Sequence, residues 1–405
     1  MTDAARLQRR IDELAKIGGS GTSVSRLGLT PLEQQARDLV SSWCERSATA
    51  IRDAAGNLRI RYAGESGNAP VVLVGSHLDS VPEGGRFDGA LGVCCAVEAV
   101  ESLKESGVRF ARPVEIVAWA DEEGARFGVG LFGSSAAFGR LPSGAAELRD
   151  TNGVSIRDAL RSLGMPGDPT KATYDTEHLR AYLELHIEQG PRLERAGRAL
   201  GVVNEIVGIY HGRVRVKGRA DHAGATVMGA RRDALVAASE LIQALERIAA
   251  RIPDAVGTVG EIAVRPGAKN VVPGACTFSL DIRAPKQGSI DQVREAFGGA
   301  IDEVAGRRGV EISIEPLHGV AVTPLDPQVR EMLVTAVRGV GVEPPLLVSG
   351  AGHDAQNPQL SGVPTGMIFV RSTGGSHTPT EFAATEDAVL GARALELAIT
   401  MLATA

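Results

Sequence analysis

A histidine and several carboxylates follow two strongly apolar runs of the chain. His77 ends the run that begins at Val71, and the run 114–120 leads directly into Asp121-Glu122-Glu123. Asp88 lies between them in a glycine-rich loop, where small neighbours let its carboxylate turn inward. Two divalent ions about 3.5–4 Å apart can share such a carboxylate and activate a water molecule. These residue types and their order predict half of a two-metal hydrolase site, with Asp88 as the bridging ligand.

Two later histidines add to this set. His186 follows the strand-like run 181–185, and His377 lies in a glycine-rich loop after the apolar run 367–370. The predicted metal ligands are therefore His77, Asp88, Glu123, His186 and His377. A mixed set of nitrogen and oxygen ligands suits zinc, and also manganese, cobalt or nickel. We expect two divalent ions per chain, with zinc favoured.

The consecutive Glu122 and Glu123 can divide two tasks between them. We expect Glu123 to bind metal and Glu122 to act as general base. Asp79, two residues after His77, is expected to orient that imidazole rather than to bind metal itself. A single histidine at a strand end, or a single acidic run, is more often structural. The hypothesis therefore depends on the order of all these segments together.

The elements that would position these side chains alternate along the chain. Strand-like patterns cover 71–77, 114–120 and 181–185, and helix-like patterns cover 90–105, 128–139 and 155–163. This alternation is typical of an α/β domain, in which catalytic groups lie at the carboxyl ends of strands. Near the N-terminus, Thr30-Pro31-Leu32-Glu33 predicts a capping box with proline at the first helical position.

The pattern changes after residue 208. Strand-like and helix-like segments then form two strand-helix-strand units, which predict a small α+β sandwich inserted into the larger domain. We expect a catalytic domain over 1–208 and 321–405 and an inserted domain over 209–320, with hinges at the two crossings. The length of 405 residues also favours two domains.

The composition of the chain argues against several classes of function and location. A net charge of −6 argues against a nucleic-acid partner, which usually requires a basic patch. The four cysteines have no metal-binding spacing and are typical of reduced residues in a cytosolic protein. The N-terminus predicts a polar helix rather than a signal peptide, and no apolar run is long enough for a membrane span. We therefore expect a cytoplasmic protein without a membrane partner.

Taken together, the motifs resemble the hydantoinase/carbamoylase branch of the dinuclear zinc peptidase superfamily. This branch includes N-carbamoyl-L-amino acid hydrolases, allantoate amidohydrolases and β-ureidopropionases. The resemblance extends from about Leu27 to the C-terminus. It rests on the segments 75–79, 85–92, 121–127, 186–190, 220–226, 270–273, 281–283, 349–355 and 376–381. Segments 186–190 and 221–226 favour the amidohydrolases over the peptidases.

The resemblance implies a zinc-peptidase-like catalytic domain with a mixed central sheet, and an inserted α+β domain that acts as a lid and forms a homodimer. It also implies substrate-binding roles for three residues of the inserted domain. His222 and Asn270 would be lent by the partner subunit, and His222 would stabilise the developing oxyanion. Arg283 would bind the substrate carboxylate in a bidentate fork.

Three residues of the larger domain are further substrate-binding predictions. Gln189, three residues after His186, could bond to the carbamoyl amide. The loop 349–355 has glycines that permit close approach of a ligand at Gly352, and it also contains His353. Structural support of this loop is an equally good interpretation.

The expected reaction is hydrolysis of the ureido C–N bond of an N-carbamoyl-L-amino acid, which gives the amino acid, ammonia and carbon dioxide. Allantoate or ureidoglycolate would suit the same site and remains the alternative within the enzyme class. A non-catalytic protein that binds ureido acids is the alternative outside it. The complete ligand set and Glu122 argue against that last interpretation, and the sequence does not identify the pocket for the substrate side chain.

Overall fold

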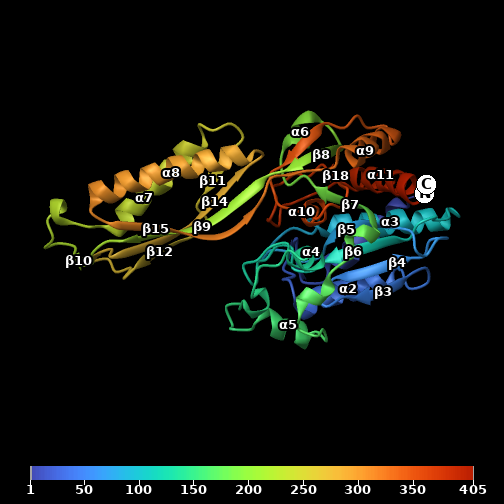
Figure 1. The fold of residues 1–405 in the computed structure, drawn as a ribbon, viewed down its shortest axis with the longest axis horizontal. Coiled ribbons are helices and arrows are strands. Elements are labelled where there is room, and N and C mark those ends of the chain that lie inside the picture. The colour runs from blue at the N-terminus through green and yellow to red at the C-terminus, as the bar shows by residue number, and fades with distance from the viewer. Residues whose placement is uncertain (1, 405) are drawn as a thin grey trace. The chain divides into compact units, whose positions relative to one another are not determined.

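The computed structural model describes residues 2–404, with every side chain in this range except that of His318. The chain forms two compact units. Unit 1 contains residues 2–204 and 324–404, and unit 2 contains Glu205–Thr323. Along the sequence, unit 2 is thus one continuous segment between the two parts of unit 1, as the colours of Figure 1 show. In the described part of the chain, no helix is both long enough and apolar enough to cross a membrane.

A mixed nine-stranded sheet forms the centre of unit 1. Its order is β16-β8-β18-β7-β5-β6-β4-β3, and β17 also pairs with β8. Strands β18, β7, β5 and β6 are parallel to their neighbours in this series, whereas β8 and β4 run antiparallel. The strands are β3 (Thr49–Arg52), β4 (Leu58–Tyr62), β5 (Val71–His77), β6 (Val114–Trp119), β7 (Leu179–Ile187), β8 (Leu200–Ile206), β16 (Thr323–Pro324), β17 (Leu346–Ser349) and β18 (Thr365–Val370). A separate hairpin pairs β1 (Gly19–Ser20) with β2 (Ser23–Val24). The predicted α/β class with a mixed central sheet is confirmed.

Helices cover this sheet because its central strands are apolar on both faces. Strands β5 and β6 are buried along their whole length. The helices of unit 1 are α1 (Ala4–Ala15), α2 (Pro31–Ser42), α3 (Ala90–Glu105), α4 (Phe132–Ala137), α5 (Ile156–Ser162), α6 (Arg192–Ala196), α9 (Pro327–Gly339), α10 (Gln356–Leu360) and α11 (Thr385–Ala403). Short 3-10 turns cover Ala145–Glu147, Pro169–Ala172 and Thr176–His178.

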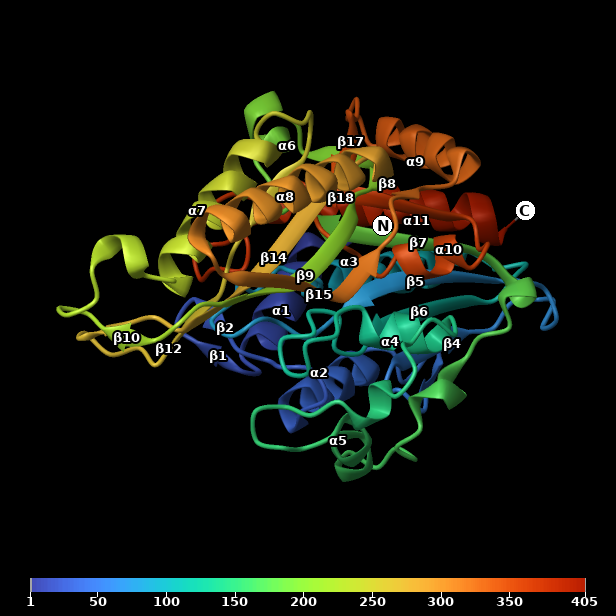
Figure 2. The ribbon, with the colours of Figure 1, turned by 60° about the vertical axis from the view of Figure 1, so that its left-hand side comes forward.

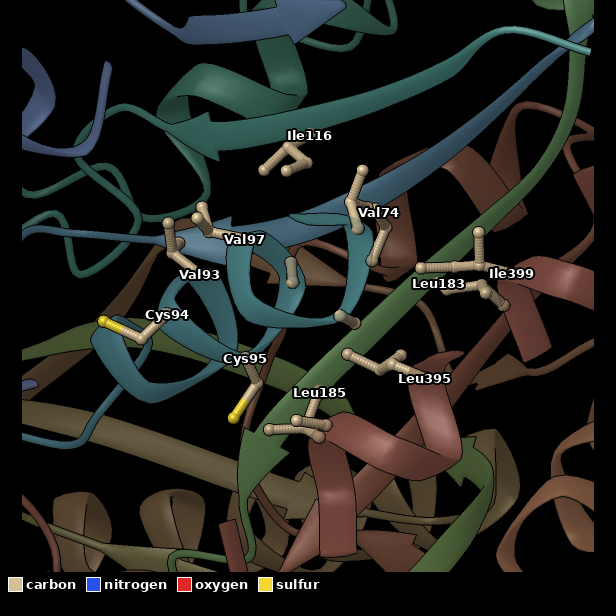
Figure 3. Close-up of a cluster of buried hydrophobic side chains, with 14 of the residues drawn as sticks. Val74, Val93, Cys94, Cys95, Val97, Ile116, Leu183, Leu185, Leu395 and Ile399 are labelled. Atoms are coloured by element: carbon tan, nitrogen blue, oxygen red, sulfur yellow. The ribbon is translucent and has the colours of Figure 1, made fainter. Parts of the chain in front are cut away.

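Helices α3 and α11 pack against each other and against the central strands. Figure 3 shows side chains of both helices directed toward β5, β6 and β7. Val74 and Ile116 from the sheet, Val97 from α3 and Leu395 from α11 belong to this core, and each is at most 1% exposed. Helix α3 starts directly after the loop that contains Asp88, so this packing fixes the position of that loop.

Unit 2 has a five-stranded sheet with two long helices on one face. The sheet order is β11-β14-β9-β15, and β12 also pairs with β14. Its elements are β9 (Gly208–Lys217), α7 (Ala234–Ala249), β11 (Val256–Thr258), β12 (Ile262–Arg265), β14 (Ala275–Ala284), α8 (Gln287–Arg308) and β15 (Glu311–Val320), with a 3-10 turn at Met228–Ala230. Figure 2 shows α7 beside α8 over these strands, and alternate side chains of β14 are buried in their shared core. A second, two-stranded sheet pairs β10 (Asp221–His222) with β13 (Val271–Val272).

Two local predictions differ from the structure. Within the inserted domain, the sequence pattern predicts one strand over 256–265. The structure divides it into β11 and β12, and Ser279 Oγ accepts the N–H groups of Gly260 and Glu261 between them. Thr30 caps α2 by accepting the N–H of Glu33 at 3.4 Å. The Glu33 carboxylate does not complete the capping box at Thr30, and instead it accepts the N–H groups of Leu29 and Asp121.

Candidate active site

Five potential ligands converge at the carboxyl ends of the parallel strands. They form two groups, His77 with Asp88 and His186, and Asp88 with Glu123 and His377. In the first group, Asp88 Oδ1 lies 3.7 Å from His77 Nε2 and 3.2 Å from His186 Nε2. In the second, Asp88 Oδ2 lies 3.4 Å from His377 Nε2, which is 3.2 Å from Glu123 Oε2. Asp88 therefore offers one oxygen to each group.

Hydrogen bonds direct the two buried imidazoles toward Asp88. His186 Nδ1 lies 2.9 Å from the carbonyl oxygen of Ile187, and His77 Nδ1 lies 3.2 Å from that of Asp79. A carbonyl only accepts, so each Nδ1 must be the protonated, donating nitrogen. Each Nε2 is then left with its lone pair facing the other ligands, which is the tautomer that a metal requires.

The electrostatics of the site favour a cation. Asp88 Oδ1 and Glu123 Oε1 are buried and accept no hydrogen bond from any described residue. Hydrogen bonds to Asp88 and Glu123 raise the pKa of His377 to about 11, against the effect of burial. Buried carboxylates without donors are costly unless a positive charge is close to them. The donor set therefore fits divalent ions, each held by imidazole and carboxylate groups.

A third group of potential ligands is already committed to other bonds. Glu184, His186 and His353 are close enough to share an ion. However, Glu184 accepts hydrogen bonds from Ser76 Oγ at 3.0 Å and from the Ala355 N–H at 2.9 Å. His353 is likewise bonded to Ser349 Oγ at 2.8 Å. Glu184 and His353 therefore already have hydrogen-bond partners within the protein.

Glu122 is buried next to the first group. Its Oε2 lies 3.6 Å from His77 Nε2, and the residue is 9% exposed. Burial raises the pKa of Glu122 well above its usual value, although the nearby His77 opposes the shift. A carboxylate with a raised pKa beside metal ligands is suited to accept and return a proton near neutral pH. Asp79 accepts the N–H groups of Glu122 and Glu123, each at 3.0 Å, and thus holds both carboxylates in place.

Glu381 and Ser376 are parts of the site to which the sequence had assigned no role. Glu381 Oε1 accepts the N–H groups of Phe87 and Asp88 at 3.1 and 3.0 Å. Ser376 Oγ lies 3.1 Å from both Asp88 Oδ2 and Glu381 Oε2, and its one proton can be donated to either. Gly85 allows this approach, because a Cβ at that position would lie 2.2 Å from Glu381 Oε1. The only sequence signal was their place in segment 376–381 beside His377.

The predicted substrate residues of unit 1 lie at the site in different ways. Gln189 donates from Nε2 to Asp88 Oδ2 at 2.8 Å and adopts a left-handed φ of 59°. With Ser372 and Gly374 it also lines a cavity of about 130 Å³. His353 is buried with its ring 4.5 Å from that of His186, so it contacts a potential ligand. The neighbouring Gly352 is half-buried.

His222 and Asn270 lie together in unit 2. His222 is the last residue of β10 and Asn270 directly precedes β13, and next to them the Ala223 N–H donates to the Asn270 carbonyl at 3.0 Å. His222 Nδ1 accepts the N–H groups of Gly224 and Ala225, both at 3.0 Å. The proton of neutral His222 must therefore be on Nε2, which makes this nitrogen a hydrogen-bond donor. Both residues are exposed.

Arg283 belongs to the other sheet of unit 2. It lies on β14 and forms a fork with Asp281, with Nε 3.0 Å from Oδ1 and an Nη 2.9 Å from Oδ2. Burial would raise the pKa of Asp281, but bonds to His211 and Arg283 lower it to about 2. An ionised Asp281 thus fixes the direction of the Arg283 guanidinium.

The chain resembles known proteins along most of its length. The profile of the family described as "Peptidase family M20/M25/M40" matches residues 73–401. The chain is 42% identical to the N-carbamoyl-L-amino acid amidohydrolase of Geobacillus stearothermophilus over 98% of this chain and 97% of the relative. It is 34% identical to the allantoate deiminase of Arabidopsis thaliana over 93% of this chain and 78% of the relative.

A solved structure is similar over nearly the whole chain. It is a hydantoinase/carbamoylase family amidase from Burkholderia vietnamiensis, with a TM-score of 0.91 and 35% identity. The match covers 99% of this chain and 98% of the chain of the amidase. The strand-end ligands, the mixed sheet and these matches lead to one conclusion: this chain belongs to the Peptidase M20/M25/M40 family.

Proposed function

We propose that this protein is a metal-dependent amidohydrolase that cleaves the ureido C–N bond of N-carbamoyl-L-amino acids. The observation that carries the proposal is the division of Asp88 between two ligand groups, with Glu122 3.6 Å from His77. The relative from Geobacillus stearothermophilus supports the choice of substrate. The products would be the amino acid, ammonia and carbon dioxide.

His77, Asp88 and His186 would hold one divalent ion, and Asp88, Glu123 and His377 the other. Such a pair of ions polarises a carbonyl group and lowers the pKa of water. Glu122 takes a proton from the attacking water as the water oxygen bonds to the ureido carbon. Glu122 then gives this proton to the leaving nitrogen as the C–N bond breaks. The buried environment of Glu122 suits both transfers, because its raised pKa makes it a competent base and acid.

Three polar residues would orient the substrate. His222 presents Nε2–H, a donor that can stabilise the oxygen on which negative charge develops. Arg283 would bind the substrate carboxylate in a bidentate fork, and Asn270 would add an amide beside His222. Gln189 bonds to Asp88 and its buried Oε1 accepts no hydrogen bond from the described residues, so it could accept from the carbamoyl NH₂.

The assembly would be a homodimer in which unit 2 is an inserted domain that lends His222 and Asn270 to the partner's site. Exposure of His222 and of its neighbours Val227 and Met228, at 73% and 76%, supports this part of the proposal. We further propose zinc as the native ion, with manganese, cobalt or nickel able to replace it. The expected compartment is the cytoplasm.

Allantoate is the second substrate that a specific observation favours. The allantoate deiminase of Arabidopsis thaliana is 34% identical over 93% of this chain. Allantoate and ureidoglycolate share the ureido group and the carboxylate, so the same ligands and Arg283 would serve them. The allantoate relative is less similar than the N-carbamoyl-L-amino acid amidohydrolase, and we therefore place it second.

A substrate panel tests the proposal. The zinc-loaded protein would be assayed for ammonia release from several N-carbamoyl-L-amino acids, their D-enantiomers, allantoate and ureidoglycolate. The highest kcat/KM should be obtained with an N-carbamoyl-L-amino acid. A preference for allantoate would replace this proposal with the second one. Binding without ammonia release from any member would favour a non-catalytic binding protein.

A further inference from the structure

The loop that carries Glu122 and Glu123 is held by two buried carboxylates, and only one of them adjoins a metal ligand. Asp79 accepts the N–H groups of residues 122 and 123. The N–H group of Asp121 donates instead to Glu33 Oε1 at 3.2 Å. Glu33 lies in the first turn of α2, 88 residues earlier in the chain, and is fully buried. Three consecutive backbone donors are thus taken by two carboxylates.

Glu33 stabilises two strained backbone positions at once. Its Oε2 accepts the N–H of Leu29 at 2.6 Å. Leu29 and Asp121 have φ values of 51° and 49°, in the left-handed region that L residues other than glycine seldom adopt. Such strain persists only where surrounding contacts determine the conformation. Glu33 supplies a contact at both positions.

The segment before α2 also fits closely against the loop. A Cβ on Gly28 would lie 2.0 Å from Asp121 Oδ1, so only glycine permits this approach. Arg37, one turn after Glu33, is fully buried and forms an ion pair with its carboxylate. Burial raises the pKa of Glu33, and the Arg37 guanidinium opposes this shift only in part.

We infer that Glu33 is a positioning residue for the catalytic loop, acting through the Asp121 N–H to set the direction of Glu122 and Glu123. The inference rests on the proposed function for the role of Glu122. Its effect on Glu123 concerns metal binding and is independent of the substrate. Residues that hold metal ligands from behind typically contribute 10–100-fold to affinity or activity.

The test compares Glu33→Gln with Glu98→Gln. The Leu29 and Asp121 N–H groups donate to different oxygens of Glu33, and a glutamine would place an NH₂ donor in front of one of them. Glu98 is a matched control, because it is also fully buried, pairs with Arg6 and Arg10, and accepts the Asp3 N–H. These partners all belong to the N-terminal segment that contains α1, and none belongs to the loop 121–123.

Four quantities would be measured on both variants: the melting temperature, kcat and KM for the best substrate of the panel, and the affinity for Co²⁺ from its visible absorbance. Both variants should melt earlier than the unmodified protein. Glu33→Gln alone should lower kcat about 10–100-fold with KM within about twofold, and should weaken Co²⁺ binding about tenfold. Glu33→Asp retains the charge and should give intermediate values.

Equal kcat and equal Co²⁺ affinity in the Glu33 and Glu98 variants would overturn the inference. If Glu33→Gln does not fold, Glu33→Asp decides in the same way. A protein that hydrolyses no ureido acid would refute the proposed function alone. In that case the Co²⁺ titration still tests whether Glu33 positions Glu123.

Discussion

The histidines of the two compact units are held in different ways. His77 and His186 of unit 1 are each 1% exposed and lie at the carboxyl ends of the parallel strands β5 and β7. His222 of unit 2 is exposed, and two N–H groups of its own turn donate to its ring. The two strand-end histidines of unit 1 are therefore held by buried surroundings, whereas unit 2 presents a donor of defined tautomer on an accessible surface. Metal binding and substrate binding should accordingly be separable by mutation.

Removal of metal should have the largest effect. Chelator-treated protein should be inactive and should recover with zinc, manganese, cobalt or nickel, because the five ligands lie in two groups. Elemental analysis of the active protein should approach two ions per chain. The melting temperature should also fall, since an ion that binds only the folded state stabilises it. Full activity with one ion or none would refute the two-metal proposal.

The Glu122→Gln substitution should have the second-largest effect. It should lower kcat by a factor of about 10²–10⁴, because the amide cannot take a proton from water. Metal content should stay at the level of the unmodified protein, since Glu122 belongs to neither ligand group. The change thus affects chemistry in unit 1 without affecting metal binding. Near-normal turnover in a metal-loaded variant would exclude Glu122 as the base.

His222→Ala should lower kcat on the order of 10²-fold, the usual loss for one oxyanion donor. Mixing this variant with Glu122→Gln should restore part of the activity. In a mixed dimer, one site receives both an intact base and an intact partner histidine, while the other lacks both. A fully active monomer in sedimentation, or mixed dimers without recovered turnover, would refute the proposal that His222 acts in the partner's site.

Arg283→Lys should give the smallest effect. A lysine keeps the charge but cannot form the fork seen with Asp281, so one hydrogen bond to the substrate carboxylate is lost. KM should rise about tenfold, which corresponds to one bond to a charged group. The kcat value should stay within about twofold, as for a group that binds substrate and transition state equally. A fall in kcat with unchanged KM would give Arg283 a role in the chemistry.

The sequence predicted the sheet strands of the site because they are long apolar runs that end in polar residues. The expected strands 71–77 and 114–120 are β5 and β6 with little change, and the expected helix 90–105 is α3. Strand β8 was not predicted. It runs antiparallel beside β18, and its residues do not alternate regularly between apolar and polar.

The support of the site was harder to predict than its ligands. The spacing of histidines and carboxylates indicates a metal site by chemistry alone. The roles of Glu33 and Glu381 depend on contacts 88 and 293–294 residues apart along the chain, which no local pattern contains. Glu33 even fits a local capping box, and tertiary contacts replace that arrangement.

The position of β18 in the sheet has a consequence for biosynthesis. This strand lies between β7 and β8, although about 160 residues separate β8 from it in the sequence. Once the chain has been translated through His186, all residues of the first ligand group are present. The second group is complete only after His377 has been translated. The centre would therefore be complete only after residues 377–381 have been translated, when Glu381 can reach the Asp88 loop. C-terminal truncation before residue 365 should leave a nascent protein with an incomplete sheet and at most one ion-binding group.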